Sequence, residues 1–179
     1  TNWSPNSYNP KLGYVYTCSG NSRTAFKAIP NASSTYVGGR TFTGFQSAAA
    51  VQGTLGTGDF TAMNVLNNKR VWKQHYIGQA FQPNVQVQTG AACSGGSLST
   101  AGGLVFRGEP DGNFLAIDAK TGQELWRFQT GFGADAPPAV YEVNGEEYVA
   151  IATGGNQGML SANGDAVWVK SPTGARIRV

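Results

Sequence analysis

Residues 116–126, AIDAKTGQELW, carry the clearest structural signal in this sequence. Asp118 can hydrogen-bond to the backbone of the turn that follows it. Gly122 can supply the positive φ that closes a short hairpin with a bulge. Trp126 then lies on the returning strand opposite the small Ala116, which leaves room for the flat indole to lie on the sheet and meet a neighbouring one. The segment therefore predicts a β-hairpin whose tryptophan packs against a neighbouring sheet.

A weaker copy of this segment lies at residues 62–72, AMNVLNNKRVW. Asn64 stands at the aspartate position and Asn68 at the glycine position, where Asn is the best-tolerated substitute for Gly. The alanine and the tryptophan are ten residues apart in both copies, and Trp72 and Trp126 are 54 residues apart. A repeat of this length suits one four-stranded blade of a β-propeller.

The rest of the chain has the pattern of short strands separated by turns, and segments with helical periodicity are essentially missing. Strands are expected at residues 12–18, 60–66, 70–77, two within 97–107 broken by Gly102-Gly103, 113–119, 123–129, 138–143, 147–153 and 165–170. Asn144-Gly145 is a strong signal for a tight hairpin turn. Residues 19–58 are expected to form a long loop with one or two strands, one of them a small-residue strand at 47–51.

Composition supports an all-β protein and excludes several functional classes. The chain has 179 residues with 25 glycines, 40% hydrophobic residues and 13% charged residues, which favours a folded, turn-rich domain over a disordered chain. The net charge of +3 is scattered, with no basic block longer than Lys69-Arg70, so nucleic acid is not expected as a partner. No apolar run approaches the roughly 18 residues of a membrane helix, so no membrane span is expected. One histidine and two cysteines are too few for a zinc site of His and Cys within this chain.

Four segments, together with the tryptophan repeat, resemble one known family. They are residues 1–16 (TNWSPNSYNPKLGYVY), 95–106 (GGSLSTAGGLVF) followed by Asp111-Gly112, 141–150 (YEVNGEEYVA) and 164–168 (GDAVW). The resemblance is to the pyrroloquinoline quinone (PQQ)-dependent alcohol dehydrogenases, which are eight-bladed propeller quinoproteins. It implies an all-β propeller fold, with residues 1–179 as the C-terminal portion of the propeller domain and about three of its eight blades.

Three blades of an eight-bladed ring form an open arc. Its exposed edges and blade faces would be an aggregation hazard, and a repeat array needs its neighbours to bury them. A second chain or chain segment that carries the remaining blades is therefore expected to complete the ring. The chain begins at Thr1 and shows no signal-peptide pattern, so it is expected to be a mature processed chain or a piece of a larger one.

The resemblance also implies a chemistry. PQQ coordinated to a calcium ion, or to a lanthanide, would accept a hydride from an alcohol or sugar alcohol to give an aldehyde or ketone, and the electrons would pass to a cytochrome c. Such relatives are periplasmic. The catalytic aspartate and most metal ligands of the family lie in earlier blades, so no aspartate of this sequence is assigned to catalysis.

The resemblance places five residues at family positions beside the cofactor. Asn2 and Trp3 match a family pair there, and Asn2 can donate an amide hydrogen to a quinone or carboxylate oxygen while Trp3 can offer its edge or face. Cys93 and Ser94 stand where the family often has a tryptophan packed on the quinone, so this chain departs from the family at that position. Asn156 lies in a stretch that corresponds to a Gly-Trp-Gly-type segment near the cofactor, again without the tryptophan. The alternatives are a turn residue for Asn2, a core aromatic for Trp3 and plain loops for the others.

Several alternatives remain open from the sequence. Cys18 and Cys93 can form a disulfide, as a periplasmic protein allows, or remain free buried thiols. His75 is expected on a strand surface, and Asp135 is the one loop acid with no evident role in a turn. A propeller scaffold without a cofactor, such as an outer-membrane assembly factor, would carry the same repeat, although residues 2–5 favour the enzyme. A carbohydrate-binding β-domain complete in 179 residues would instead be a stable monomer.

Overall fold

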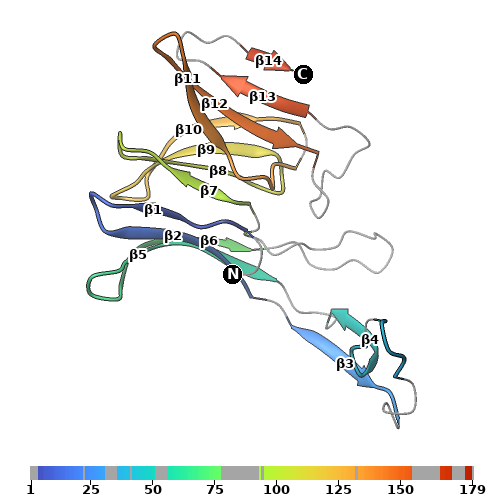
Figure 1. The fold of residues 1–179 in the computed structure, drawn as a ribbon. Helices are drawn as coiled ribbons and strands as arrows, with labels where there is room; N and C mark the ends of the chain where they lie inside the picture. Colours follow the sequence, from blue (N-terminus) through green and yellow to red (C-terminus); the bar gives the residue numbers. More distant parts are fainter. Residues whose placement is uncertain are drawn as a thin grey trace.

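Three four-stranded antiparallel sheets make up most of the chain (Figure 1). The computed structural model describes residues 4–21, 23–30, 36–40, 42–50, 56–77, 93, 95–131, 133–154, 166–170 and 176–178. Within these residues every regular element is a β-strand, and none of them forms a helix that could cross a membrane. The all-β architecture predicted from the repeat and the turn signals is therefore confirmed.

Each of the three sheets is one blade, and its strands follow the chain order across the sheet. Blade 1 consists of β1 (Ser7–Asn9), β2 (Tyr14–Asn21), β5 (Thr57–Asn64) and β6 (Lys69–Ile77). Blade 2 consists of β7 (Ser97–Ser99), β8 (Leu104–Gly108), β9 (Asn113–Asp118) and β10 (Glu124–Gln129). Blade 3 consists of β11 (Ala139–Val143), β12 (Glu146–Thr153), β13 (Ala166–Lys170) and β14 (Arg176–Arg178).

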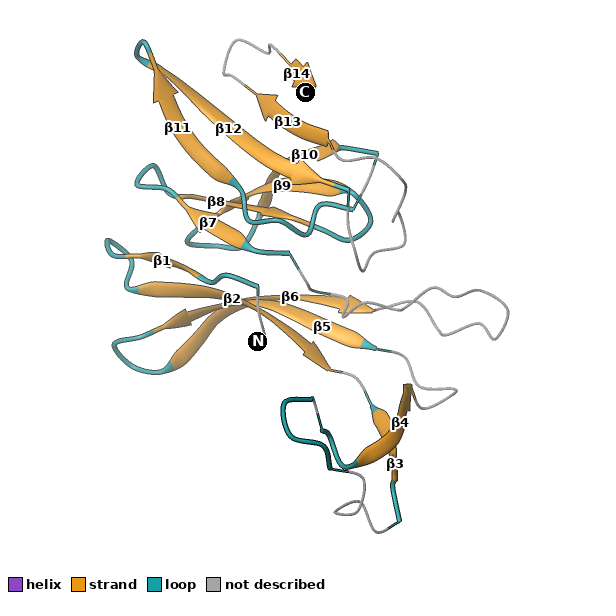
Figure 2. Ribbon diagram, turned by 45° about the vertical axis from the view of Figure 1, so that its right-hand side comes forward, coloured by secondary structure: helices purple, strands orange, loops and turns teal. Residues whose placement is uncertain are grey.

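A further hairpin interrupts blade 1. It consists of β3 (Thr24–Ala28) and β4 (Phe45–Ala50), lies between β2 and β5 in the chain, and projects away from the blade (Figure 2). This hairpin confirms the expectation that the connection through residues 19–58 contains one or two strands. The tight turn at Asn144-Gly145 is also confirmed, with φ of 54° and 80° at the two residues.

Two strands of these blades were not expected from the sequence. β1 lies in a polar segment with two prolines and becomes a strand because it pairs with β2, with Tyr8 opposite Val15. β14 is three residues long and pairs with β13. Both are edge strands of their blades, and so short a segment gives too few positions for an alternating pattern to show.

The two copies of the repeat have the predicted hairpin geometry. Trp126 lies opposite Ala116, and Trp72 lies opposite Ala62, each with a register shift in the pairing next to the turn. Gly122 has a φ of 77°. The Asp118 carboxylate accepts hydrogen bonds from two backbone amides of the turn, those of Lys120 (3.0 Å) and Thr121 (2.7 Å).

The Trp72 indole packs against the neighbouring sheet, as predicted. It lies against Gly122 of blade 2, where a Cβ would be 2.6 Å from an indole carbon, and its Nε1 donates a hydrogen bond to the Ala119 carbonyl (3.2 Å). Tyr16 stacks on the same indole and donates to the same carbonyl (2.8 Å). Blade 1 therefore docks on the β9–β10 turn of blade 2 through an aromatic pair and one shared acceptor.

A third copy of the register occurs in blade 3, although its residues differ. Trp168 of β13 pairs with Arg178 of β14, again ten residues apart. In this copy a tryptophan stands at the alanine position and an arginine at the tryptophan position. The residue types hide the repeat from sequence comparison, while the backbone pairing preserves it.

The hydrophobic core lies between blades and not within one blade. One buried cluster is shared by blades 1 and 2, and a second by blades 2 and 3. The buried members of the first are Tyr16, Cys18, Phe60, Ala62, Cys93, Val105, Leu115, Ile117 and Ala119. The buried members of the second are Phe106, Phe114, Ala116, Ala134 and Ile151. Each blade is therefore stabilised by its neighbours, as expected for a stacked repeat.

Candidate functional site

The connections that lead into the blades are joined to each other by backbone hydrogen bonds, and we call these connections the connector ladder. Its bonds are Ser97 N to Pro5 O (3.1 Å), Gly96 N to Asp135 O (3.4 Å) and Gly154 N to Gly133 O (3.0 Å). The first joins blade 1 to blade 2, and the other two tie in the segments that flank the strands of blade 3. The ladder therefore gathers segments that are far apart in the sequence at one edge of the arc, the connector edge.

Glycine is required where these segments approach each other. A Cβ on Gly96 would be 2.8 Å from Cβ of Pro137 and 3.0 Å from Cδ of Pro5. A Cβ on Gly95 would collide with the carbonyl oxygen of Gly108, and one on Gly108 would collide with the carbonyl oxygen of Ala134. The backbone of the connector edge is thus packed in direct contact, and side chains that serve a ligand must come from positions beside it.

The predicted site residues flank this ladder in the sequence. Asn2, Trp3, Ser94 and Asn156 lie outside the described residues, so their side chains stay a prediction. Each is within three positions of a ladder residue: Pro5, Gly96 or Gly154. The ladder thus brings together Pro5, Gly96 and Gly154, which are the ladder residues nearest in the sequence to the predicted cofactor contacts.

Cys93, the fifth predicted residue, is described, and it is buried and bonded to Cys18 of β2. The two Cα atoms are 5.5 Å apart and the bridge spans a sequence separation of 75. The sequence had left free thiols open as an alternative, and the structure has none among the described residues. Because a Cβ on Gly58 would be 2.6 Å from the Cys93 amide nitrogen, Cys93 is seated tightly on β5. Whether it also contacts a cofactor stays a prediction.

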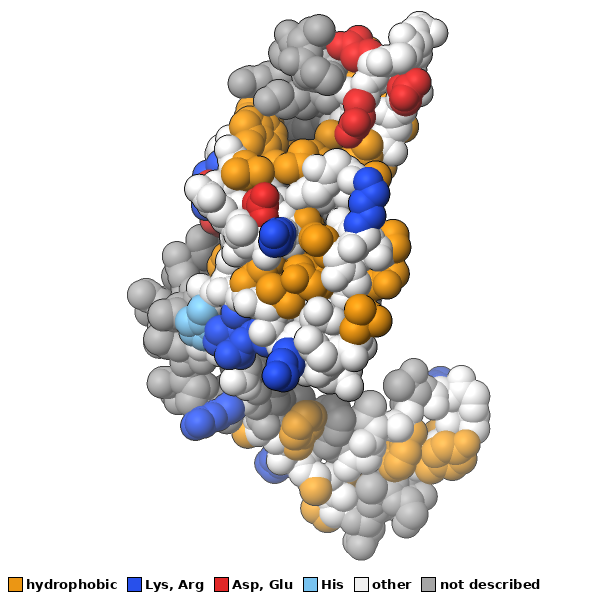
Figure 3. All heavy atoms as spheres, turned by 90° about the vertical axis from the view of Figure 1, so that its left-hand side faces the viewer, with side chains coloured by type: hydrophobic (Ala, Val, Ile, Leu, Met, Phe, Trp, Pro, Cys, Tyr) orange, Lys and Arg blue, Asp and Glu red, His pale blue; other side chains and the backbone are white. Residues whose placement is uncertain are grey.

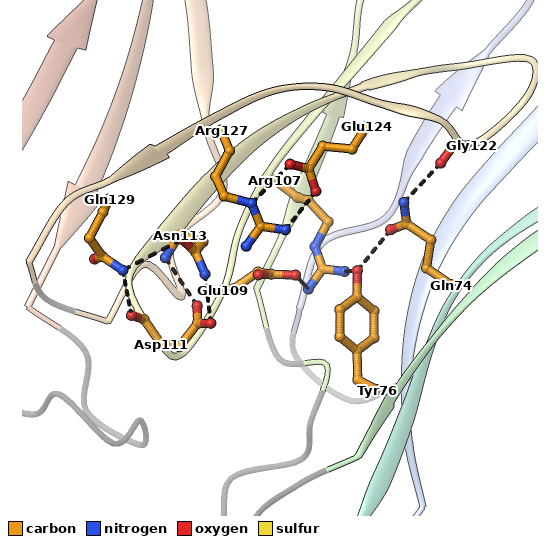
Figure 4. A network of polar contacts seen from close by, with 10 residues as sticks. All are labelled: Gln74, Tyr76, Arg107, Glu109, Asp111, Asn113, Gly122, Glu124, Arg127 and Gln129. Atoms are coloured by element: carbon orange, nitrogen blue, oxygen red, sulfur yellow. Dashed lines mark hydrogen bonds and ion pairs between the residues drawn. The ribbon is translucent and has the colours of Figure 1, made fainter.

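A buried polar network lies between blades 1 and 2 (Figure 4). The Arg107 guanidinium is fully buried between the rings of Phe60 (4.6 Å to the centroid) and Tyr76 (4.9 Å). Its Nη1 donates to the Tyr76 hydroxyl (3.0 Å), and its Nη2 is 3.8 Å from Oε1 of Glu109. The Glu109 carbonyl in turn accepts a hydrogen bond from the Ala134 amide (3.0 Å), in the loop that holds ladder residues Gly133 and Asp135 and that we call the ladder loop.

The network continues to the docking turn of blade 2. The Tyr76 hydroxyl donates to Gln74 Oε1 (2.7 Å), and Gln74 Nε2 donates to the Gly122 carbonyl (2.9 Å). Burial raises the pKa of the Tyr76 hydroxyl and of the Glu109 carboxyl, while the Arg107 charge acts against both increases. The interface between the two blades is therefore dry enough to disfavour charge, although it holds a cation and a carboxyl.

Sequence reasoning missed this network. The available signal was the segment 104–109, LVFRGE, in which two opposite charges flank a glycine at the end of an otherwise apolar strand. A buried strand rarely carries charge unless the charges are paired. This pattern could have suggested an interblade ion pair.

A second charged cluster is exposed. Asp59 accepts from His75 Nδ1 (2.6 Å) and lies 3.3 Å from Lys73 Nζ, and both contacts hold the pKa of Asp59 below its usual range, the His75 hydrogen bond most strongly. His75 is 47% exposed, which confirms its placement on a strand surface. Exposed pairs of this kind contribute little to stability.

The described residues do not form a complete site for a quinone cofactor or for its metal. No group of three or more His, Cys, Asp or Glu side chains within them could hold a metal ion. The glycines of the connector ladder are filled by neighbouring backbone and side chains, so they leave no cradle for a flat ligand. No chemical step is therefore assigned to the described residues.

Comparison with known proteins gives a consistent result. A family model described as the β-propeller domain of PQQ-containing glucose, ethanol and alcohol dehydrogenases matches residues 29–149. A 1-butanol dehydrogenase (quinone) of Thauera butanivorans is 34% identical over 160 residues, which cover 86% of this chain and 22% of that protein.

Solved structures agree with the sequence match. The quinohemoprotein alcohol dehydrogenase of Comamonas testosteroni superposes with a TM-score of 0.62 at 29% identity, over 85% of this chain and 22% of that chain. A europium-containing methanol dehydrogenase superposes with a TM-score of 0.59 at 27% identity, over 84% of this chain and 24% of that chain. The chain therefore spans less than a quarter of the length of these similar proteins.

Proposed function

The chain belongs to the PQQ-dependent alcohol dehydrogenase β-propeller family, and from this premise we propose that it supplies three blades to a quinoprotein that oxidises an alcohol or sugar alcohol to an aldehyde or ketone. The observation that carries the proposal is that the similarity covers most of the chain, with both copies of the repeat inside the family match at residues 29–149, and that the similar proteins are named as dehydrogenases.

The chain is proposed to form the C-terminal portion of the propeller. A second chain or chain segment with the remaining blades would complete the ring. Two observations support this. The chain spans 22% of the length of two similar dehydrogenases. The cores that hold its blades together lie between blades, and the blades at the two ends of an arc cannot complete such cores alone.

PQQ and its calcium or lanthanide ion would supply the two-electron oxidant and the Lewis acid of such a site. In this proposal Asn2 donates an amide hydrogen to an oxygen of the cofactor and Trp3 presents its ring, while Cys93, Ser94 and Asn156 line the pocket. The proposed catalytic aspartate lies outside this chain. The name of one similar structure, a europium-containing methanol dehydrogenase, supports keeping a lanthanide beside calcium.

The protein is proposed to act in the periplasm and to pass its electrons to a cytochrome c. The Cys18–Cys93 disulfide supports an oxidising compartment, because structural disulfides are rare in the cytosol. The acceptor proposal is supported by similar proteins whose names include cytochrome c. An assay that supplies either purified cytochrome c or a soluble quinone would show which of these acceptors the protein reduces.

The test of the proposed function uses the native assembly that co-purifies with this chain. After incubation with PQQ and either calcium or a lanthanide, it should show quinone absorbance and reduce a redox dye when an alcohol is added. Asn2→Ala should lower dye reduction, and Asn6→Ala, at an exposed position four residues later, should leave it unchanged. An assembly that binds no quinone and reduces no dye would instead support a cofactor-free scaffold.

A further inference from the structure

Blade 1 docks on the β9–β10 turn of blade 2, and blade 1 contains a closely similar turn. In blade 2 this docking corner consists of Ala119, whose carbonyl accepts the Trp72 hydrogen bond, and Gly122, on which the indole lies. The residues 54 positions earlier are Val65 and Asn68. They form the β5–β6 turn of blade 1, on the side that a preceding blade would contact.

Backbone bonds show that the two corners are equivalent. Val65 N donates to Gly13 O and Ala119 N donates to Gly103 O, both at 2.9 Å. The side-chain oxygen of Asn64 accepts from the amide two residues later (2.9 Å), and that of Asp118 does the same (3.0 Å). Asn68 and Gly122 both have positive φ, 56° and 77°. The two turns therefore present the same backbone to the blade in front of them.

The side chains at the two corners differ where docking takes place. At Gly122 a Cβ would lie within 2.6–2.9 Å of three indole atoms of Trp72, closer than real Cβ contacts permit. Asn68 has a Cβ at the same backbone position. An indole cannot lie on Asn68 as Trp72 lies on Gly122, because the space is already taken.

Exposure shows that the blade 1 corner lacks its neighbour. Ala119 is fully buried by blade 1, whereas Val65, at the same position of the repeat, is 42% exposed and the adjacent Leu66 is 84% exposed. Figure 3 looks onto the edge that carries these turns and shows hydrophobic side chains exposed along it. The corner of blade 1 thus has larger side chains than that of blade 2 and nothing within the described residues that covers them.

We infer that the propeller blade packed in front of blade 1 carries a residue smaller than tryptophan at its docking position, ten residues after the small residue of its repeat. Val65 and Asn68 fill part of the volume that Trp72 occupies at the next junction, so a smaller side chain restores close packing. The inference rests on the completed ring of the proposed function, and not on the dehydrogenase activity.

The test is a double-mutant cycle in the complete propeller, with dye reduction measured in parallel. Tryptophan is introduced at the docking position of the preceding blade, alone and together with Asn68→Gly. We expect the tryptophan alone to lower the melting temperature by several degrees, and Asn68→Gly to recover most of that loss. Gly122→Asn is the matched control, because it places the same side chain under Trp72 and should lower the melting temperature as well.

An equal loss from the introduced tryptophan with and without the Asn68→Gly substitution would overturn the inference, since it would show that the corner does not contact the docking residue. The unmodified propeller gives a second readout if a variant fails to fold. Its crystal structure should have no indole in van der Waals contact with Cβ of Asn68, and an indole stacked there would overturn the inference. Neither result depends on dye reduction, so failure of the proposed activity remains distinguishable.

Discussion

Replacing Arg107 with methionine should destabilise the complete propeller far more than the same replacement at Arg127. Both arginines pair with a glutamate. The Arg127–Glu124 pair is the closer one at 2.6 Å, but its side chains are 48% and 37% exposed. The Arg107–Glu109 pair is longer at 3.8 Å, and its side chains are 0% and 8% exposed. Burial and not distance should therefore decide the order of the two effects.

The magnitudes follow from what each replacement leaves behind. Methionine at position 107 fills the space between Phe60 and Tyr76 but leaves the Glu109 carboxylate buried without its cation, which costs about 3–5 kcal/mol. It also removes a hydrogen bond to Tyr76 and two ring contacts. An exposed pair such as that of Arg127 is worth about 0–1 kcal/mol.

Urea unfolding at pH 7, followed by tryptophan fluorescence, measures both free energies of unfolding. The double variant Arg107→Met/Glu109→Gln should recover most of the loss, because removing both charges leaves no unpaired ion in the interface. A loss of less than about 1 kcal/mol for Arg107→Met, or no recovery in the double variant, would refute the view that burial dominates this pair.

The same pair predicts a pH dependence. Burial raises the pKa of Glu109 above its ordinary value of 4.5, and Arg107 lowers it. A carboxyl with a raised pKa in the folded state contributes stability that is complete below its unfolded pKa and is lost as pH rises through its folded pKa. Without Arg107 the folded pKa rises further. The deficit of Arg107→Met should therefore be largest at pH 7 and shrink as the pH falls toward 4.5.

Three further predictions concern stability. Reducing the Cys18–Cys93 bridge, with its separation of 75 residues, should lower the free energy of unfolding by about 2–5 kcal/mol, measured by denaturation with and without dithiothreitol. Gly108→Ala should lower the melting temperature markedly because its Cβ meets a carbonyl oxygen of the ladder loop, whereas Gly102→Ala, with its nearest atom at 3.8 Å, should change it little. Hydrogen bonds from its turn lower the pKa of Asp118 in the folded protein. Its stabilising contribution is therefore present above its ordinary pKa of 3.8 and is lost as the pH falls through its folded pKa. Asp118→Asn should flatten the acid limb of a curve of unfolding free energy against pH.

The predictability of the fold came from local chemistry. The turn after Asp118 needs an acceptor, a residue with positive φ and a small residue opposite the tryptophan, and all three lie within eleven residues. Such a segment specifies its hairpin without knowledge of the rest of the chain. In blade 3 the same register persists with Trp168 opposite Arg178, where the residue types no longer show it.

The Arg107 network could not be predicted in the same way. Arg107 and Glu109 lie two residues apart, but Tyr76 and Phe60 come from another blade, 31 and 47 residues earlier. Whether a charge in an apolar strand is buried with a partner or exposed depends on which face meets the neighbouring blade. Without the blade packing, an exposed arginine on β8 fits the sequence equally well.

The two edges of the arc hold neighbouring blades together by different means, which explains why the architecture was easier to predict than the site. At the edge that carries the β5–β6 and β9–β10 turns, the contact is made by particular side chains, such as Trp72 on Gly122. These residue types recur in the sequence as a repeat. At the connector edge the contact is made by backbone groups, such as Gly96 N with Asp135 O, which require only that certain residues be small. Side chains at positions beside that edge are free to change without loss of these backbone contacts. Chemistry there can therefore vary while the fold persists.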